Sequence, residues 1–267
     1  MKFGQFSIDD ARGIVLAHAM KLPEAKFSKG HVLQDDDLYR IKAAGQISVS
    51  IVIPAAGMSS RMGKSGAHKL LAQFDGIPLV RRTALVATDS VASSVTVVLG
   101  HREQELRNAI SGVDVSIVVN ADYASGMSGS LASGFMTGQV RKAQGVLIML
   151  ADMPGITTAD LNRLIAEFRR SGGTAIVRAS SQGKPGNPVI LPKALQDAVL
   201  RLEGDIGARH LIETSSLQVI NVEIGPAAHI DLDTPEAIAD AGGVILDISP
   251  ADGRSNRGRQ VTTPESN

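Results

Sequence analysis

The chain contains no cysteine and no tryptophan, and it has only two tyrosines and six phenylalanines among 267 residues. Without cysteine there can be no disulfide, thiolate zinc site, iron–sulfur cluster or cysteine nucleophile. Aromatic residues make up only 3% of the chain, which disfavours stacking platforms for single-stranded nucleic acid. The 27 basic and 27 acidic side chains cancel, so no overall basic field directs the protein to nucleic acid.

Long hydrophobic runs are also missing. No apolar run approaches the roughly 18 residues that a membrane-spanning helix needs. The N-terminal residues, with Asp9, Asp10 and Arg12, do not form the apolar core of a secretory signal. We therefore expect neither a membrane nor a nucleic acid as partner, and we predict a cytoplasmic protein, which the absence of cysteine also fits.

The hydrophobic residues that are present, 43% of the chain, suffice for a full core. Apolar runs rich in β-branched residues alternate with helical patterns, at residues 49–54, 95–99, 115–119, 146–150, 174–177 and 219–224. Runs such as 145–150 show no alternation of polarity, as expected for strands covered on both faces. The pattern predicts an α/β fold with a Rossmann-like, mostly parallel sheet flanked by helices, and ligands beyond the carboxyl ends of its strands.

The composition also predicts three regions. Residues 48–248 carry the alternating pattern and form the main domain. Residues 1–47 differ, with a polar segment at 26–30 and an acidic helix start at 35–37, so we expect a small separate appendage. Residues 249–267 hold Ser, Gly, Arg, Pro and Thr with almost no large apolar side chains, which predicts a disordered tail.

Residues 51–63 form the most informative segment, because an apolar strand runs directly into a loop of small residues that carries Arg61. Small residues let backbone N–H groups approach an anion, a helix is expected to follow, and a guanidinium adds charged donors. The segment continues into Gly63-Lys64-Ser65, the ending of a P-loop. Five residues separate Gly57 from Gly63, whereas a P-loop has four, so the spacing disfavours a P-loop NTPase.

The loop instead resembles a known signature. Residues 55–63, followed by Lys69-Leu70-Leu71, are similar to the nucleotidyltransferases that act on molybdopterin. The Ala-Ala-Gly form is closest to the molybdenum cofactor cytidylyltransferases, and Ala56 stands where guanylyl-transferring relatives carry glycine, which favours CTP over GTP. Other segments resemble the family in order: a second nucleotide loop at 120–131, a metal-binding strand end at 150–154, a product-side loop at 186–189, a substrate-side segment at 204–209 and a second metal-binding element at 231–236. Residues 1–45 loosely resemble the leading segment of molybdopterin-binding proteins.

The resemblance implies a nucleotide-diphospho-sugar transferase-like fold and an activity. The expected reaction is the Mg²⁺-dependent transfer of CMP from CTP to the phosphate of a molybdopterin-type cofactor, with release of pyrophosphate. A molybdoenzyme or its chaperone is the further partner that such a reaction implies. The resemblance assigns catalysis to Arg61, Lys69 and Asp152, and metal binding to Asp152 and Asp233. It assigns acceptor binding to Asn187, Pro188 and Arg209, and nucleotide binding to Ala55, Ala56, Gly57, Ser59, Arg61, Gly63, Lys69, Asp122, Ser128 and Ser130.

The chemistry gives a reason for these residue types. Mg²⁺ takes one or two carboxylates together with phosphate oxygens and water, which suits Asp152 and Asp233 at two strand ends. Cationic side chains would stabilise negative charge on the transferring group and on pyrophosphate. Five residues separate Gly63 from Lys69 where the family commonly has two, so Lys64 remains the alternative lysine, and Asp231 remains the alternative metal ligand.

Structural roles and other functions stay open from the sequence. Asp152 could cap the turn before a helix near Thr157, Asp233 could open a helix, and Ser128 and Ser130 stand at another helix start. Guanylyl transfer, another phosphate acceptor, a P-loop-like NTPase and a non-catalytic carrier of pterin or nucleotide are the competing functions.

Overall fold

A seven-stranded sheet forms the centre of the computed structural model, which describes residues 11–17, 19–21, 26–62, 68–204 and 207–245. Its strands are β3 (Val49–Ala55), β6 (Ser94–Leu99), β7 (Ser116–Val119), β8 (Gly145–Ile148), β9 (Ile176–Ser181), β10 (Lys184–Pro192) and β11 (Val219–Glu223). Their order in the sheet is β11-β9-β10-β8-β3-β6-β7. All neighbours pair in parallel except β10, which is antiparallel to both β8 and β9. The predicted α/β fold with a mostly parallel sheet is confirmed.

Strand β10 is the strand of the seven-stranded sheet that the sequence did not predict. The segment at 186–189 was expected to be a loop, and this expectation is wrong, because the segment lies within β10. Two prolines and a glycine lie within four consecutive residues of β10. Its sequence does not predict a strand, because both residue types normally interrupt one. The pairing register shifts between Pro185 and Val189, and the Asn187–Pro188 peptide bond is cis. Pro188 lies within this shift and has no partner in the register, whereas Pro185 is still paired with Ser180.

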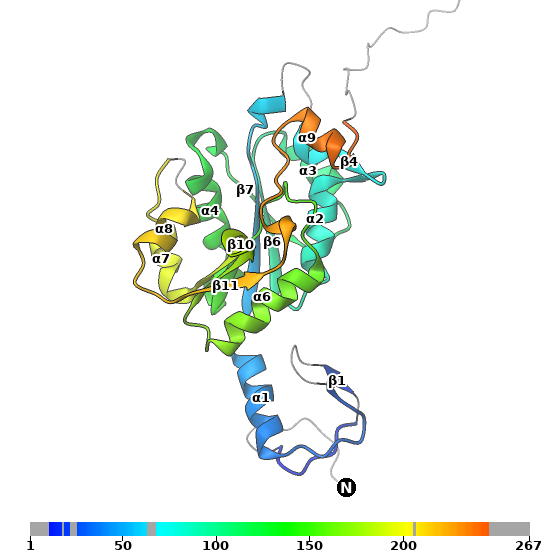
Figure 1. Ribbon diagram of the computed structural model, residues 1–267, viewed down its shortest axis with the longest axis vertical. Helices are drawn as coiled ribbons and strands as arrows, with labels where there is room; N and C mark the ends of the chain where they lie inside the picture. Colours follow the sequence, from blue (N-terminus) through cyan, green and yellow to red (C-terminus); the bar gives the residue numbers. More distant parts are fainter. Residues whose placement is uncertain (1–10, 18, 22–25, 63–67, 205–206, 246–267) are drawn as a thin grey trace, which may run out of the picture.

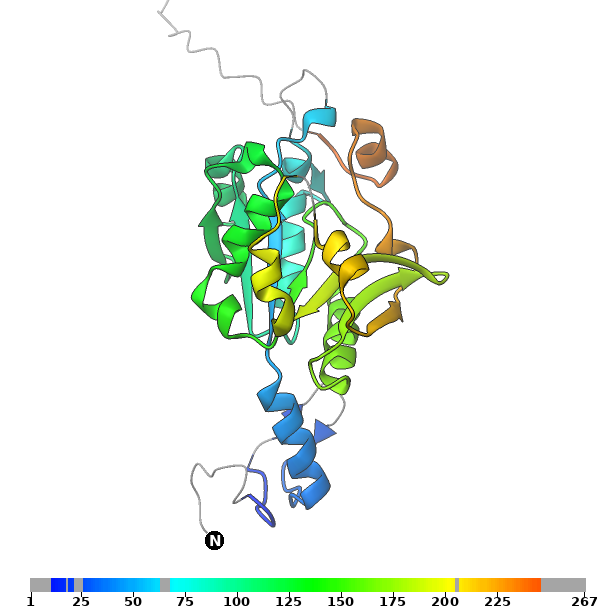
Figure 2. The same ribbon diagram turned by 90° about the vertical axis from the view of Figure 1, so that its left-hand side faces the viewer.

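Helices cover both faces of the sheet (Figures 1 and 2). One face carries α2 (Leu79–Thr88), α3 (Glu103–Ala109) and α6 (Thr158–Arg170), and the other carries α4 (Met127–Phe135), α5 (Gly138–Lys142), α7 (Gln196–Val199) and α8 (Ala208–Thr214). Along β3, Ile51 and Ile53 belong to the core under the first group, and Val52 belongs to the core under the second. Two apolar faces explain why the strand sequences show no alternation of polarity.

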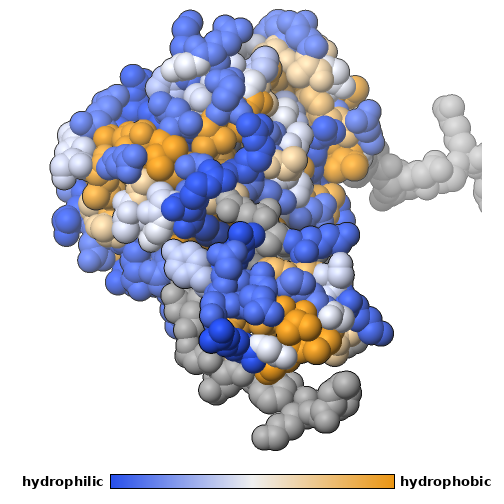
Figure 3. Space-filling view, turned by 60° about the horizontal axis from the view of Figure 1, so that its bottom comes forward, coloured by the Kyte–Doolittle hydropathy of each residue, from blue (hydrophilic) through white to orange (hydrophobic). Residues whose placement is uncertain are grey.

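The N-terminal residues lie at the end of the sheet opposite to the carboxyl ends of the parallel strands. Helix α1 (Asp35–Gln46) precedes β3 directly, and a short hairpin of β1 (Met20–Lys21) and β2 (Lys26–Phe27) lies beside it (Figure 1). Seen from this end, the surface shows apolar patches separated by hydrophilic residues (Figure 3). The predicted division at residue 47 remains a prediction, and the predicted tail lies outside the described residues. No helix in the described ranges is both long and apolar enough to cross a membrane.

Candidate active site

The loop after β3 differs from the helix start that was expected there. After Ala55 the chain makes a single 3₁₀ turn at Ser60–Met62, and the next α-helix among the described residues is α2. The predicted helix directly after the loop is therefore wrong for these residues. Predicted residue Gly63 and the alternative Lys64 lie outside the described residues.

Ser59 is the unusual residue of this loop. Its φ of 52° is in the left-handed region, which non-glycine residues seldom adopt. Its Oγ is buried and has no hydrogen-bond partner in the part of the chain that the structure describes. A buried hydroxyl normally finds a partner, so this one is placed for a ligand that the loop would hold.

His68 connects the loop after β3 to the turn that contains Lys69. The ring is buried, Nε2 donates to the carbonyl oxygen of Gly57 over 3.2 Å, and Nδ1 accepts from the backbone N–H of Leu70 over 3.3 Å. One nitrogen donates and the other accepts, which requires the neutral imidazole. Burial lowers the pKa of His68 to about 4, and the neighbouring His101 adds to this effect. The sequence did not predict this role of His68, and the only indication of it was the position of His68 directly before Lys69.

Lys69 connects the two predicted metal ligands. It lies in the 3₁₀ turn Lys69–Leu71, and its Nζ is 2.5 Å from Oδ2 of Asp152 and 2.7 Å from Oδ1 of Asp233. Burial by itself would lower the pKa of Lys69, but the two carboxylates outweigh it and raise the pKa. The hydrogen bond from Lys69 is in turn the main reason why the pKa of Asp233 is lowered. Arg61 also donates to Asp233, so Asp233 accepts from both predicted cationic residues, and Lys69 links it to Asp152.

A backbone contact brings together the two aspartates, which lie 81 positions apart in the sequence. The Leu232 N–H donates to the carbonyl oxygen of Asp152 over 3.0 Å, which places the segment before α9 (Pro235–Asp240) against the loop after β8. Neither aspartate caps a helix. Thr157 caps α6 and Thr234 caps α9, in each case with its own side chain. The alternative capping roles are therefore filled by other residues.

The donor set fits a divalent cation of the hard, oxygen-binding kind. Oδ1 of Asp152 is buried and has no hydrogen-bond partner within the described residues. The described residues hold no cluster of three or more His, Cys, Asp or Glu side chains that could bind a metal by themselves. Mg²⁺ and similar ions need only one or two carboxylates when phosphate oxygens and water complete the shell. Asp231, the alternative ligand, lines a neighbouring cavity instead.

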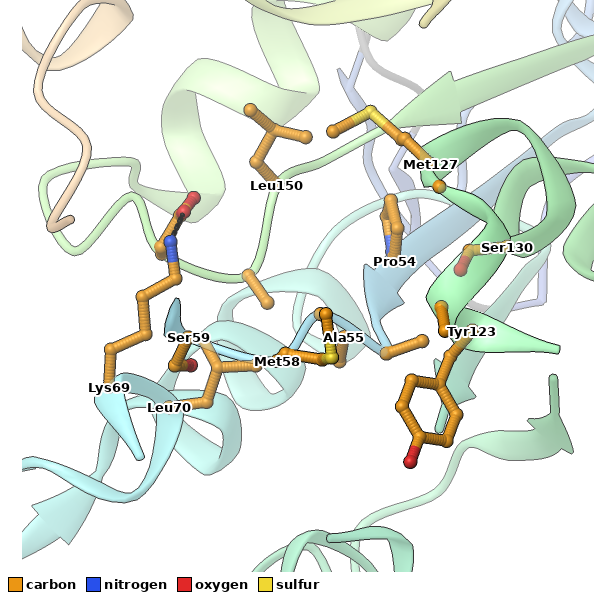
Figure 4. Close-up of a pocket in the computed structure, with 16 residues that line it drawn as sticks. Pro54, Ala55, Met58, Ser59, Lys69, Leu70, Tyr123, Met127, Ser130 and Leu150 are labelled. Atoms are coloured by element: carbon orange, nitrogen blue, oxygen red, sulfur yellow. Dashed lines mark hydrogen bonds and ion pairs between the residues drawn. The ribbon is translucent and has the colours of Figure 1, made fainter. Parts of the chain in front are cut away.

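Ser59, Lys69 and Asp152 line a cavity of about 290 Å³ at the carboxyl end of β3. Figure 4 shows Lys69 and Leu150 on one side of it, Tyr123 and Ser130 on the other, and Met58 and Ser59 between them. The Ser128 hydroxyl is engaged elsewhere, since it donates to the carbonyl oxygen of Gly204 over 2.6 Å. Of the predicted nucleotide-binding residues, the cavity is lined by Ala55, Ala56, Gly57, Ser59, Lys69 and Ser130, but not by Arg61, Asp122 or Ser128.

A second cavity, of about 520 Å³, adjoins the first and shares Met127 and Leu150 with it. The predicted acceptor residues Asn187 and Arg209 line it, and Pro188 does not. Arg178 on β9 also lines it, and the sequence analysis missed this residue because the expected strand ended at residue 177. The available signal was a single charge within an otherwise uncharged strand.

Two family models match parts of the chain. Residues 51–219 match the MobA-like NTP transferase domain family, and residues 5–52 match a domain of unknown function, DUF8806. The chain is 30% identical over 167 residues to nicotine blue oxidoreductase from Paenarthrobacter nicotinovorans, a match that covers 60% of this chain and 79% of the relative. It is 26% identical over 193 residues to the molybdenum cofactor cytidylyltransferase of Escherichia coli strain K12, covering 71% and 93% of the two chains.

A solved structure shares the fold. The crystal structure of Rv0371c from Mycobacterium tuberculosis H37Rv in complex with manganese superposes with a TM-score of 0.60 and 22% identity, covering 72% of this chain and 97% of the other. The matched family covers more than half of this chain, including the loop after β3, Lys69 and Asp152. The chain therefore belongs to the MobA-like NTP transferase family and is a nucleotidyltransferase of that family.

Proposed function

We propose that the protein transfers CMP from CTP to the phosphate of a molybdopterin-type cofactor and releases pyrophosphate. The observation that carries the proposal is the position of Lys69 Nζ, 2.5 Å from Asp152 and 2.7 Å from Asp233, at the edge of a cavity lined by small residues. Such a cavity provides donors for phosphate oxygens and carboxylates for a divalent cation. Ala56 and the E. coli cytidylyltransferase relative support CTP as the nucleotide and the pterin cofactor as acceptor.

In this reaction an oxygen of the acceptor phosphate forms a bond to the α-phosphorus of CTP. The bond from that phosphorus to the oxygen that bridges to the β-phosphate breaks, and pyrophosphate leaves with the electron pair. A phosphate nucleophile is largely ionised near pH 7, so no side chain has to act as general base. Lys69 and Arg61 would stabilise the negative charge of the transferring group, and removal of one such donor typically lowers the rate roughly 10²- to 10³-fold.

Asp152 and Asp233 would hold the divalent cation. The unpartnered Oδ1 of Asp152 and the partly exposed carboxylate of Asp233 support this assignment, as does the manganese in the Rv0371c structure. When bound, the cation would neutralise charge on phosphate oxygens of the nucleotide. Ser59, whose hydroxyl has no partner among the described residues, would donate to a phosphate oxygen in the same cavity.

Calorimetry with CTP, GTP and ATP, each with Mg²⁺ and with Mn²⁺, tests the nucleotide. We expect cation-dependent binding that prefers CTP. A preference for GTP would contradict the cytidylyl assignment and favour guanylyl transfer. Asp152→Asn should abolish the cation dependence, and a fully active Asp152→Asn enzyme would refute the metal assignment.

A coupled pyrophosphate assay with molybdenum cofactor as acceptor tests the reaction. We expect pyrophosphate only when both CTP and acceptor are present. Orthophosphate release without acceptor would indicate an NTPase instead, and tight binding without turnover would indicate a carrier. One relative is named an oxidoreductase, and a shared fold does not determine the reaction, so this assay also decides between group transfer and redox chemistry.

A further inference from the structure

Arg178 occupies a position that its neighbours fill with aliphatic side chains. It is paired in register with Val189 on β10, and Val189 is paired with Ile148 on β8. Residues in register on neighbouring strands point to the same face of a sheet. Val189 and Ile148 both belong to the hydrophobic core on the α4 and α8 side, so Arg178 places a guanidinium on that side too.

This guanidinium has no hydrogen-bond partner at its Nε, which is buried, within the described part of the chain. Burial lowers the pKa of Arg178, and nearby Arg209 lowers it further, while Glu213 raises it. Glu213 already accepts a hydrogen bond of 2.8 Å from Arg209. A charged group that is partly buried without a bonded counter-charge costs free energy, so its presence here points to an anionic ligand.

The second cavity offers room for such a ligand. Arg178 and Arg209 line it together with Glu213 and Asp231. Because Glu213 is bonded to Arg209, the Nε of Arg178 is the buried donor of this cavity that has no partner among the described residues. The cavity meets the nucleotide cavity at Met127 and Leu150. A molecule that enters both cavities would therefore reach from the arginines to the carboxylates around Lys69.

The reacting phosphate and the arginine are separate in space. Arg178 is two strands away from Ile148, which corresponds to ~10 Å, and Asp152 lies four residues further along from Ile148. Of the two cavities, Arg178 lines only the second and Asp152 only the first. An anion at Arg178 would be a second charged group of the acceptor.

We propose that Arg178, together with Arg209, binds an oxyanion at the far end of the acceptor from the phosphate that reacts. The acceptor would then carry two anionic groups, one beside Asp152 and one in the second cavity. Arginine suits this task because its planar fork donates two parallel hydrogen bonds to phosphate or carboxylate oxygens. The inference rests on the proposed function only in taking the occupant of the second cavity to be the acceptor.

The test uses the full chain and inorganic phosphate or acetate as probes, with no nucleotide present. The ¹⁵N-labelled arginine Nε–H signals are followed by NMR during each titration. We expect the Arg178 signal to shift and saturate, and Arg178→Met to weaken this phosphate binding about tenfold or more, the typical loss for a charged hydrogen bond. The tighter of the two probes identifies the class of oxyanion.

Three variants make the outcome decisive. In Lys69→Met the Arg178 signal should still shift on addition of phosphate. If that shift is lost in Lys69→Met, the anion binds in the nucleotide cavity and the proposal is overturned. Arg107→Met, which removes one positive charge from α3 on the other face, should leave phosphate affinity unchanged. Arg178→Lys keeps the charge but not the planar fork, so we expect an intermediate phosphate affinity. This variant replaces Arg178→Met in the test if Arg178→Met does not fold.

Unchanged phosphate affinity in Arg178→Met would refute the inference, as would the absence of any shift in the wild-type signal. Calorimetry with CTP on the same Arg178→Met protein should give wild-type affinity. Failure of the wild-type chain to bind CTP would refute the proposed function, and this result is distinct because the phosphate titration requires no nucleotide.

Discussion

Acid should destabilise this protein through one buried imidazole. His68 has a pKa of about 4 in the folded protein against 6.5 for the free side chain, because it is buried and both ring nitrogens are engaged as a neutral donor and acceptor. Between these two pH values the unfolded chain binds the proton and the folded chain does not. The stabilisation is therefore complete above pH 6.5 and is lost as the pH falls towards 4.

The size of the effect follows from the two pKa values. A difference of about 2.5 pKa units corresponds to a total of about 3 kcal/mol. Most of this loss, about 2 kcal/mol, should occur between pH 7 and pH 5, because the unfolded histidine is almost fully protonated at pH 5.

Urea unfolding at pH 7 and at pH 5 measures the effect, with His68→Gln as the variant. Glutamine can still donate to the Gly57 carbonyl but does not titrate, so it should lose about 2 kcal/mol less than the wild type between the two pH values. His210→Gln replaces an exposed histidine and is the matched control, with the wild-type pH dependence expected. An identical pH dependence in wild type and His68→Gln would refute the reasoning, because it would show that folding does not lower the pKa of His68.

Three further predictions concern Lys69, the divalent cation and the packing of α4 on β3. Lys69→Met should lower the rate of pyrophosphate formation roughly 10²- to 10³-fold, and an unchanged rate would contradict the role of Lys69. The same variant leaves Asp152 and Asp233 close together without a cation, so the free energy of unfolding should fall at low salt and recover with added Mn²⁺. Treatment with EDTA should abolish CTP binding in calorimetry, and restoration by Mg²⁺ or Mn²⁺ but not by Na⁺ should follow, whereas EDTA-resistant binding would contradict a metal held by the two aspartates. Gly134→Ala should cost about 1–3 kcal/mol in urea unfolding, because a Cβ there would lie 2.5 Å from Cγ1 of Val52, while Gly138→Ala, which has open space around its Cα, should cost far less.

Much of the fold could be predicted because it depends on local patterns. Apolar runs predicted the strands β3, β6, β7, β8, β9 and β11. The runs of the central strands β3, β6 and β8 show no alternation of polarity because these strands are buried on both faces. Helices were also expected to begin near Thr157 and after Asp233, and α6 and α9 begin there. Strand β10 was missed because proline and glycine normally interrupt a strand, and the pairing that makes this segment a strand is supplied by the neighbouring β8 and β9.

The candidate site shows the same division. The sequence by itself determined which residue types are available for phosphate and cation binding: the small residues after β3, Lys69, and two aspartates that follow strands. It could not show that the Leu232 N–H bonds to the Asp152 carbonyl and so brings Asp233 to the same lysine, because that contact joins segments far apart in the chain.

Only the tertiary structure decided which charges have partners. It gave Lys69 two carboxylates, left Oδ1 of Asp152 and Nε of Arg178 without a hydrogen bond among the described residues, and enclosed His68 so that it stays neutral. Each of these properties depends on burial and on the distance between atoms from different elements. A sequence states which ionisable groups exist, whereas the folded chain decides how far each is removed from water and which charge it meets.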